Sequence, residues 1–174
     1  MKSAFVETIH GTLVNVRGDG VLLCGESGSG KSECALELIS RGHILIADDA
    51  VRVERIDKVL LGRSPDGLTG LLAICGLGIC DIGQLYGRSS IADSCEISLC
   101  IQLGAESLAV DHETFGCERL EFEIMGIKIP WFVISNSTSR LLPVIVETAV
   151  RMLKRGVNIT ETSLVTHYNK AVAW

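Results

Sequence analysis

Eight consecutive residues near the start of the chain have the types and spacing needed to hold a phosphate group. They fit the pattern G-x-x-x-x-G-K-[ST] at every fixed position. Glycines let the backbone wrap so that successive N–H groups point at phosphate oxygens. Lys31 can reach the β- and γ-phosphates of a nucleoside triphosphate, and the Ser32 hydroxyl can bind Mg²⁺. The eight residues are Gly25, Glu26, Ser27, Gly28, Ser29, Gly30, Lys31 and Ser32.

The flanking residues give this loop the context that it requires. The apolar run Val21–Cys24 predicts a strand before the loop, and a helix is predicted from about Lys31 to Ser40, ended by Gly42. The positive end of the helix adds to the attraction for phosphate. The alternative is a glycine-rich turn that arose by chance, but strand, turn and helix in this order favour a binding site for a nucleoside triphosphate and Mg²⁺.

Two adjacent acids follow the next predicted strand, His43–Ala47. In phosphate-loop enzymes an acid at a strand end often serves the metal, so Asp48 and Asp49 allow a division of labour. One can bind Mg²⁺ while the other takes a proton from an attacking hydroxyl. The alternative is a polar turn between two strands, where Asp is common.

Other polar residues have a structural interpretation beside the functional one. A lone histidine such as His10 is more often structural than catalytic. Glu33 falls in the first helical turn, where an acid favours the helix dipole in any case. Arg140 could contact a phosphate or be solvated at the start of a helix, and Asp81 could bind a metal or occupy a turn.

Composition indicates one folded domain, residues 1–174, with 47% hydrophobic and 21% charged residues. A net charge of -5 gives no reason to expect nucleic acid or an anionic membrane as a partner. Apolar runs stay below the roughly 18 residues that span a bilayer. The seven cysteines include no C-x-x-C pair, so we expect small buried hydrophobes in a reducing cytoplasm, and no zinc site.

The remaining pattern predicts an α/β protein without repeats or an interdomain linker. We expect strands, turns and loops in the following places: a strand Thr8–Val16 with a turn Arg17–Gly20, a strand Val51–Ile56, a loop Gly62–Gly67, irregular chain over Gly76–Gly87, and strands Glu96–Leu103, Glu121–Ile124 and Ile127–Ile134. A helix is predicted from about Arg140 to Arg155 with Pro143 in its first turn, and Thr160 could begin a short last helix.

Taken together, these pieces resemble the catalytic domain of the HPr kinase/phosphorylase family, a short form without the N-terminal domain. The resemblance lies in HGTLV (10–14), GESGSGKSECALELISRGH (25–43), LIADDAV (45–51), GLGICDIGQLYG (76–87) and the Arg140 region. It implies a P-loop fold similar to phosphoenolpyruvate carboxykinase, with a mixed sheet and flanking helices, assembled as a hexamer. It also implies an ATP- and Mg²⁺-dependent enzyme that phosphorylates a serine of the phosphocarrier HPr and removes that phosphate.

The resemblance also implies roles for individual residues. His10 and Lys31 would be catalytic. Asp49 would accept the proton in the kinase direction and return it in reverse, and Asp48 would be its neighbour in the metal and His10 network, with Ser32 on the metal. Arg119 aligns with the essential arginine of the family.

Three departures from the family pattern keep other functions open. Ala73 and Cys75 stand where the family carries Glu and Arg, and that Glu is a magnesium ligand. The segment 135–141 keeps only Arg140 of its usual pattern. The alternatives are a catalytically weak regulatory module that senses nucleotide or phosphate, and a phosphotransferase for a small hydroxyl-bearing substrate.

Overall fold

The structure is a computed structural model that describes residues 6–104, 120–134 and 142–156. Its elements, in chain order, are β1 (Val6–His10), β2 (Thr12–Val16), β3 (Asp19–Gly25), α1 (Lys31–Ser40), β4 (Ile44–Ala47), β5 (Ala50–Ile56), β6 (Val59–Arg63), β7 (Leu71–Ile74), β8 (Gly78–Asp81), α2 (Ile82–Tyr86), the 3₁₀ turn η1 (Arg88–Ser90), β9 (Ser94–Leu103), β10 (Leu120–Ile124), β11 (Ile127–Ile134) and α3 (Leu142–Arg155). None of the helices in these ranges is long and apolar enough to cross a bilayer.

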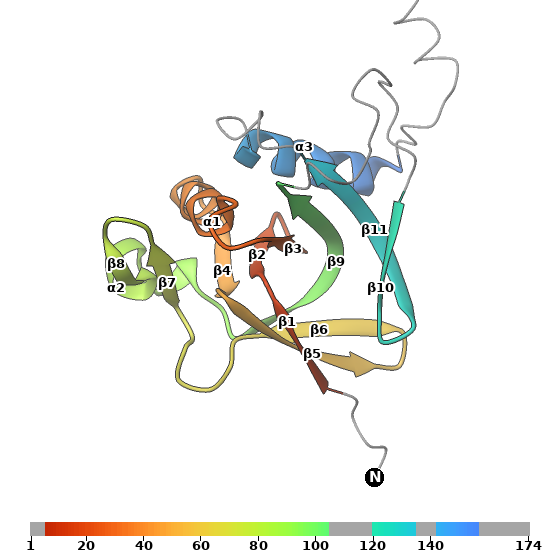
Figure 1. Ribbon diagram of the computed structural model, residues 1–174, viewed down its shortest axis with the longest axis horizontal. Coiled ribbons are helices and arrows are strands. Elements are labelled where there is room, and N and C mark those ends of the chain that lie inside the picture. Colours follow the sequence, from red (N-terminus) through yellow and green to blue (C-terminus); the bar gives the residue numbers. More distant parts are fainter. Residues whose placement is uncertain (1–5, 105–119, 135–141, 157–174) are drawn as a thin grey trace, which may run out of the picture.

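A mixed, curled sheet of nine strands organises these elements (Figure 1). Its main path runs β1-β5-β6-β9-β3-β2-β4, and the hairpin of β10 and β11 joins through β11 and β9. The long strand β9 pairs in parallel with β3 and with β11, and antiparallel with β6. The mixed α/β class predicted from the sequence is therefore confirmed. The strand β3, which leads into the predicted phosphate loop, lies beside β9 and is buried on both faces.

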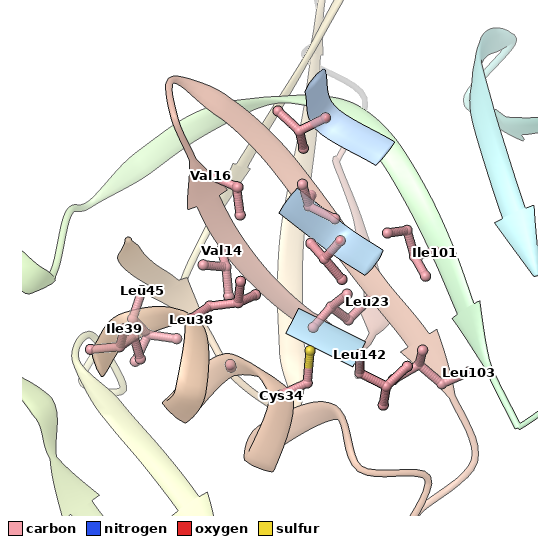
Figure 2. Close-up of a cluster of buried hydrophobic side chains, with 14 of the residues drawn as sticks. Val14, Val16, Leu23, Cys34, Leu38, Ile39, Leu45, Ile101, Leu103 and Leu142 are labelled. Atoms are coloured by element: carbon pink, nitrogen blue, oxygen red, sulfur yellow. The ribbon is translucent and has the colours of Figure 1, made fainter. Parts of the chain in front are cut away.

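Two apolar clusters lie on the two faces of the sheet. Side chains along β3 alternate between the two clusters, so that Val21 and Leu23 face one cluster while Leu22 and Cys24 face the other. The first cluster is covered by α1 and α3, as Figure 2 shows for Leu38 beside Val14 and for Leu142 beside Leu23. Burial of each leucine side chain contributes about 1.5–3 kcal/mol, so this packing holds α1, and with it the loop, against the sheet.

The end of α1 confirms the predicted role of Gly42. Its φ is 90°, a left-handed conformation that favours glycine. The Gly42 N–H donates to the Ile39 carbonyl at 2.9 Å, and the His43 N–H donates to the Leu38 carbonyl at 3.1 Å. These paired bonds close the helix and turn the chain directly into β4, which ends at Ala47, one residue before Asp48.

Most of the predicted elements are confirmed, but the single strand Thr8–Val16 is wrong. The chain breaks at Gly11 into β1, which pairs with β5, and β2, which pairs with β3 and β4. A Cβ at Gly11 would lie 2.7 Å from the Leu23 carbonyl oxygen, so close backbone approach explains the glycine. The turn is also shorter than predicted, since Asp19 and Gly20 already belong to β3.

Two glycine-rich stretches are more regular than the sequence suggested. Gly62 and Arg63, predicted to be loop, belong to β6, where a Cβ on Gly62 would lie 2.3 Å from Leu13 Cδ2. The predicted irregular chain over Gly76–Gly87 contains a turn, strand β8 paired with β7, and helix α2. In both places the glycine reflects close packing or a turn within regular structure. The predicted helix at Thr160 lies outside the described residues.

The cysteines follow the prediction in part. Cys24, Cys34, Cys95 and Cys100 are buried, and Cys75 is exposed, which contradicts the expectation of burial for that residue. Burial raises the pKa of Cys34 and of Cys95 to about 12, so both thiols stay protonated as small apolar groups. Cys117 lies outside the described residues.

An ion pair joins the end of α1 to α3. The Nε2 of His43 lies 2.8 Å from Glu147 Oε1, and both side chains are largely buried. Arg41 Nη1 lies 3.5 Å from Glu147 Oε2, and Arg17 Nη2 lies 4.0 Å from Glu147 Oε1. The hydrogen bond from His43, together with the charges of His43, Arg41 and Arg17, holds the pKa of Glu147 below its ordinary value.

Replacing Glu147 with Gln should lower the free energy of unfolding by about 1 kcal/mol at neutral pH. A carboxyl whose pKa is lower in the folded state stabilises above its unfolded pKa, and this contribution is lost as pH falls through the folded pKa. The difference between wild type and Glu147→Gln should therefore shrink below about pH 4. Urea unfolding at several pH values measures it. Glu37→Gln, at the exposed pair with Arg41, is the control, with an expected loss of about 0.3–0.5 kcal/mol. Equal losses in both variants would contradict the prediction.

Candidate functional site

The loop between β3 and α1 contains the glycines that the sequence predicts to surround phosphate. Three of its glycines have positive φ values, 145° at Gly25, 79° at Gly28 and 90° at Gly30. Gly30 occupies the N-cap position of α1 and, as a glycine, gives the first turn no side-chain cap. The N–H groups that open the helix are therefore left to a ligand or to water.

Lys31 is folded back onto this loop. Its side chain is buried, and Nζ donates to the carbonyls of Gly25 at 2.9 Å and of Glu26 at 2.8 Å. Within the described residues, Ser29 Oγ is also buried and has no hydrogen-bond partner. An ammonium group and an unpaired hydroxyl in a glycine-rich loop fit a triphosphate, whose oxygens accept from both.

Asp48 is the buried acid of the pair. Thr12 Oγ1 donates to Asp48 Oδ1 at 2.7 Å, and the Ala73 N–H donates to Asp48 Oδ2 at 3.0 Å. The Ser32 hydroxyl lies 3.2 Å from one Asp48 oxygen and 3.3 Å from the other. The structure thus brings together Ser32 and Asp48, the two residues predicted to bind the metal.

Asp49 is the exposed acid, and its backbone is left-handed with φ 62°. Its carbonyl accepts a hydrogen bond from the Gly11 N–H at 3.2 Å and contacts His10 Nδ1 at 2.9 Å. Because a carbonyl only accepts, His10 carries its hydrogen on Nδ1 when neutral, which leaves Nε2 as the ring acceptor. His10 thus lies beside Asp49 and contacts its main chain.

The oxygen atoms of Ser32 and Asp48 suit Mg²⁺, which is often bound by one or two carboxylates together with substrate phosphates. Over the described ranges, His, Cys, Asp and Glu nowhere gather in groups of three or more that could hold a metal by themselves. Asp81 caps α2, accepting from the Gln84 N–H at 3.0 Å and from Gln84 Nε2 at 2.9 Å, and Glu33 is exposed. The set fits the metal only in combination with a nucleotide.

Two predicted residues cannot be placed, and one residue of the site was not predicted. Arg119 and Arg140 lie outside the described residues. Thr12 was not among the predicted residues, although it is fully buried and bonded to Asp48. The sequence held one signal for it, a hydroxyl directly before the apolar pair Leu13 and Val14.

Comparisons with known proteins show which family this chain matches. The chain matches the family described as HPr Serine kinase C-terminal domain over residues 2–166. The HPr kinase/phosphorylase of Caldicellulosiruptor bescii is 46% identical over 155 residues, 87% of this chain and 50% of that protein. The one from Clostridium tetani is 40% identical over 150 residues, 86% of this chain and 49% of that protein. The chain thus spans about half the length of the curated relatives that it matches.

A solved structure is similar over almost the whole chain. The Hpr(Ser) kinase/phosphatase from Coxiella burnetii matches with a TM-score of 0.79 and 29% sequence identity. The match covers 93% of this chain and 97% of that chain. The curled mixed sheet described above is therefore also the fold of that structure.

Gly25→Ala should destabilise the protein more than Gly28→Ala. A Cβ at Gly25 would lie 2.7 Å from both the Leu103 carbonyl oxygen and Ser29 Oγ, whereas one at Gly28 would meet nothing within 4 Å. The expected loss of unfolding free energy is about 2–4 kcal/mol for Gly25→Ala and about 1–2 kcal/mol for Gly28→Ala. Urea unfolding of both variants tests this, and losses of equal size would show that the contact with Leu103 does not constrain the loop.

Proposed function

The chain belongs to the HPr serine kinase C-terminal domain family, and we propose that it is a serine kinase and phosphorylase acting on HPr. The main support is that three groups lie close together. The phosphate loop ends at Ser32, the Ser32 hydroxyl reaches the buried Asp48, and Asp49 stands exposed beside His10. A nucleotide site and a proton acceptor thus adjoin, which phosphoryl transfer requires.

In the proposed complex the triphosphate of ATP lies in the loop from Gly25 to Ser32. Lys31 would exchange its two loop carbonyls for phosphate oxygens, and the N–H groups at the start of α1 would add further hydrogen bonds. Ser32 and Asp48 would hold Mg²⁺, which neutralises charge on the phosphates when bound. The fold type would be the P-loop arrangement similar to phosphoenolpyruvate carboxykinase.

The proposed proton acceptor is Asp49. Its exposed carboxyl can meet a serine of a partner protein, whereas the buried carboxylate of Asp48 is occupied by three donors. In the kinase direction Asp49 takes the serine proton as the oxygen attacks the γ-phosphate. In reverse, inorganic phosphate attacks phosphoserine, and Asp49 returns the proton to the serine oxygen. His10 would position Asp49, and Arg119 would stabilise charge on the transferred group.

The proposal extends to assembly and context. We propose a single catalytic domain, residues 1–174, that assembles as a homohexamer in the cytoplasm.

One observation favours the alternative of a catalytically weak, nucleotide-sensing module. Ala73 contributes only its N–H to Asp48, in a position where the family carries a carboxylate. The site would then hold metal and nucleotide but transfer phosphate slowly.

Incubation with γ-labelled ATP, Mg²⁺ and HPr should place label on a serine of HPr. Asp49→Asn should slow the transfer about 10²-fold or more and still bind ATP, because only the proton acceptor is lost. Lys31→Met should lose ATP binding itself, measured by calorimetry. Transfer by Asp49→Asn at the wild-type rate would refute the assigned role of Asp49. Absence of transfer in wild type, with ATP bound, would favour the nucleotide-sensing alternative.

Ala73→Glu should tighten Mg²⁺ binding in the nucleotide complex about three- to tenfold, because affinity rises with the number of carboxylate ligands. Ala73 is exposed on β7, so the longer side chain needs no core space. Ala73→Gln, which adds similar bulk without charge, is the control. ADP affinity is measured at increasing Mg²⁺ concentrations. The readout is the Mg²⁺ concentration at which half of the total increase in ADP affinity is reached. Equal behaviour of the Glu and Gln variants would contradict the prediction.

A further inference from the structure

Thr12 lies against the proposed metal site and has no part in the chemistry above. Its side chain is fully buried at the start of β2, a strand whose neighbouring positions Leu13 and Val14 belong to the apolar core. A buried hydroxyl requires a hydrogen-bond partner, and this one donates to Asp48 Oδ1 at 2.7 Å. The short distance and the charged acceptor make it a strong hydrogen bond.

The two oxygens of Asp48 are held from two different elements. Thr12, on β2, binds Oδ1, and the Ala73 N–H, on β7, binds Oδ2 at 3.0 Å. The carboxylate therefore cannot turn about its last side-chain bond without losing both hydrogen bonds. Each oxygen keeps a second lone pair. The Ser32 hydroxyl lies 3.2 and 3.3 Å from these oxygens and marks the side on which they can still accept a ligand.

The sheet fixes the place of the Thr12 hydroxyl. Thr12 pairs with Leu23 on β3, two residues before Gly25, and β2 also pairs with β4, which ends one residue before Asp48. The Thr12 hydroxyl is thus on β2, Asp48 directly follows the neighbouring strand β4, and Ser32 is on α1, the helix that comes after β3. The pairing of these three strands sets the positions of the donor and of the two proposed metal ligands. Neighbouring groups that orient a metal ligand commonly change metal affinity 10- to 100-fold when they are removed.

We propose that Thr12 is a positioning residue for the divalent cation. Its hydroxyl fixes the carboxylate of Asp48 so that Asp48 and Ser32 face one cation when a nucleotide is bound. This inference rests on the nucleotide and metal site of the proposed function. It does not depend on which protein accepts the phosphate, nor on the rate of transfer.

Three variants separate the hydroxyl from the packing of Thr12. Thr12→Val keeps the shape and removes the donor, Thr12→Ser keeps the donor and removes the methyl group, and Thr8→Val is an exposed strand control on β1. Calorimetry gives the affinity for ADP without metal. Electron paramagnetic resonance of free Mn²⁺ gives the affinity of the ADP complex for the cation.

Thr12→Val should bind ADP without metal within about twofold of wild type, because Thr12 contacts Asp48 and not the loop. Its ADP complex should bind Mn²⁺ about 10- to 100-fold more weakly. Thr12→Ser should stay within about threefold of wild type, and Thr8→Val should be unchanged. If Thr12→Val does not fold, Thr12→Ala, which needs no added volume, takes its place in the same titrations.

Wild-type Mn²⁺ affinity in Thr12→Val would overturn the proposal. So would an equal loss in Thr12→Ser, because the methyl group and not the hydroxyl would then matter. A wild-type ADP complex that binds no Mn²⁺ would overturn it together with the proposed metal site. Failure to label HPr is a separate result, which would count against the kinase function and leave the Mn²⁺ comparison valid.

Discussion

The buried carboxylate of Asp48 is the constraint on which the site depends. A charged group that leaves water must find hydrogen-bond donors, and its burial is otherwise costly. Asp48 receives three donors from three elements, Thr12 on β2, Ser32 on α1 and the Ala73 N–H on β7. The hairpin of β7 and β8 is a separate two-stranded sheet, so its contact with Asp48 helps to fix it beside the loop. Satisfying one carboxylate thus brings together parts of the chain that are distant in sequence.

The adjacent acids differ in environment, and this difference divides their proposed work. Asp48 is buried and surrounded by donors, whereas Asp49 is exposed and turns away on a left-handed backbone. That turn also presents the Asp49 carbonyl to His10 and to the Gly11 N–H. The predicted strand Thr8–Val16 therefore breaks at Gly11 for a structural reason. Gly11 lets the chain pass close to β3 and places His10 at the end of β1, beside the second acid.

The local parts of this site could be predicted from the sequence, and the contacts between them could not. Sequence patterns are strongest over short spacings, and the local parts lie within about 25 residues of one another. These parts are the loop, α1 with Gly42 at its end, and the two acids after β4. The bond from Thr12 to Asp48 joins residues 36 apart and depends on strand pairing. Gly62 was misread because its reason is the side chain of Leu13, which only the folded sheet brings near. Cys75 lies in a stretch with apolar neighbours, yet the turn after β7 leaves it exposed.

A single carboxylate facing Ser32 has a consequence for how metal and nucleotide bind together. In the part of the chain that the structure describes, the two other acids considered for the metal are engaged or exposed, since Asp81 caps α2 and Glu33 lies on the surface. One carboxylate and one hydroxyl would hold Mg²⁺ weakly, because Mg²⁺ prefers six oxygen ligands and gives up water reluctantly. In the proposed complex the phosphates would have to supply further oxygens, and the cation would in turn reduce the repulsion among them. Binding of the two ligands should therefore be strongly coupled, and by linkage each must raise the affinity for the other by the same factor.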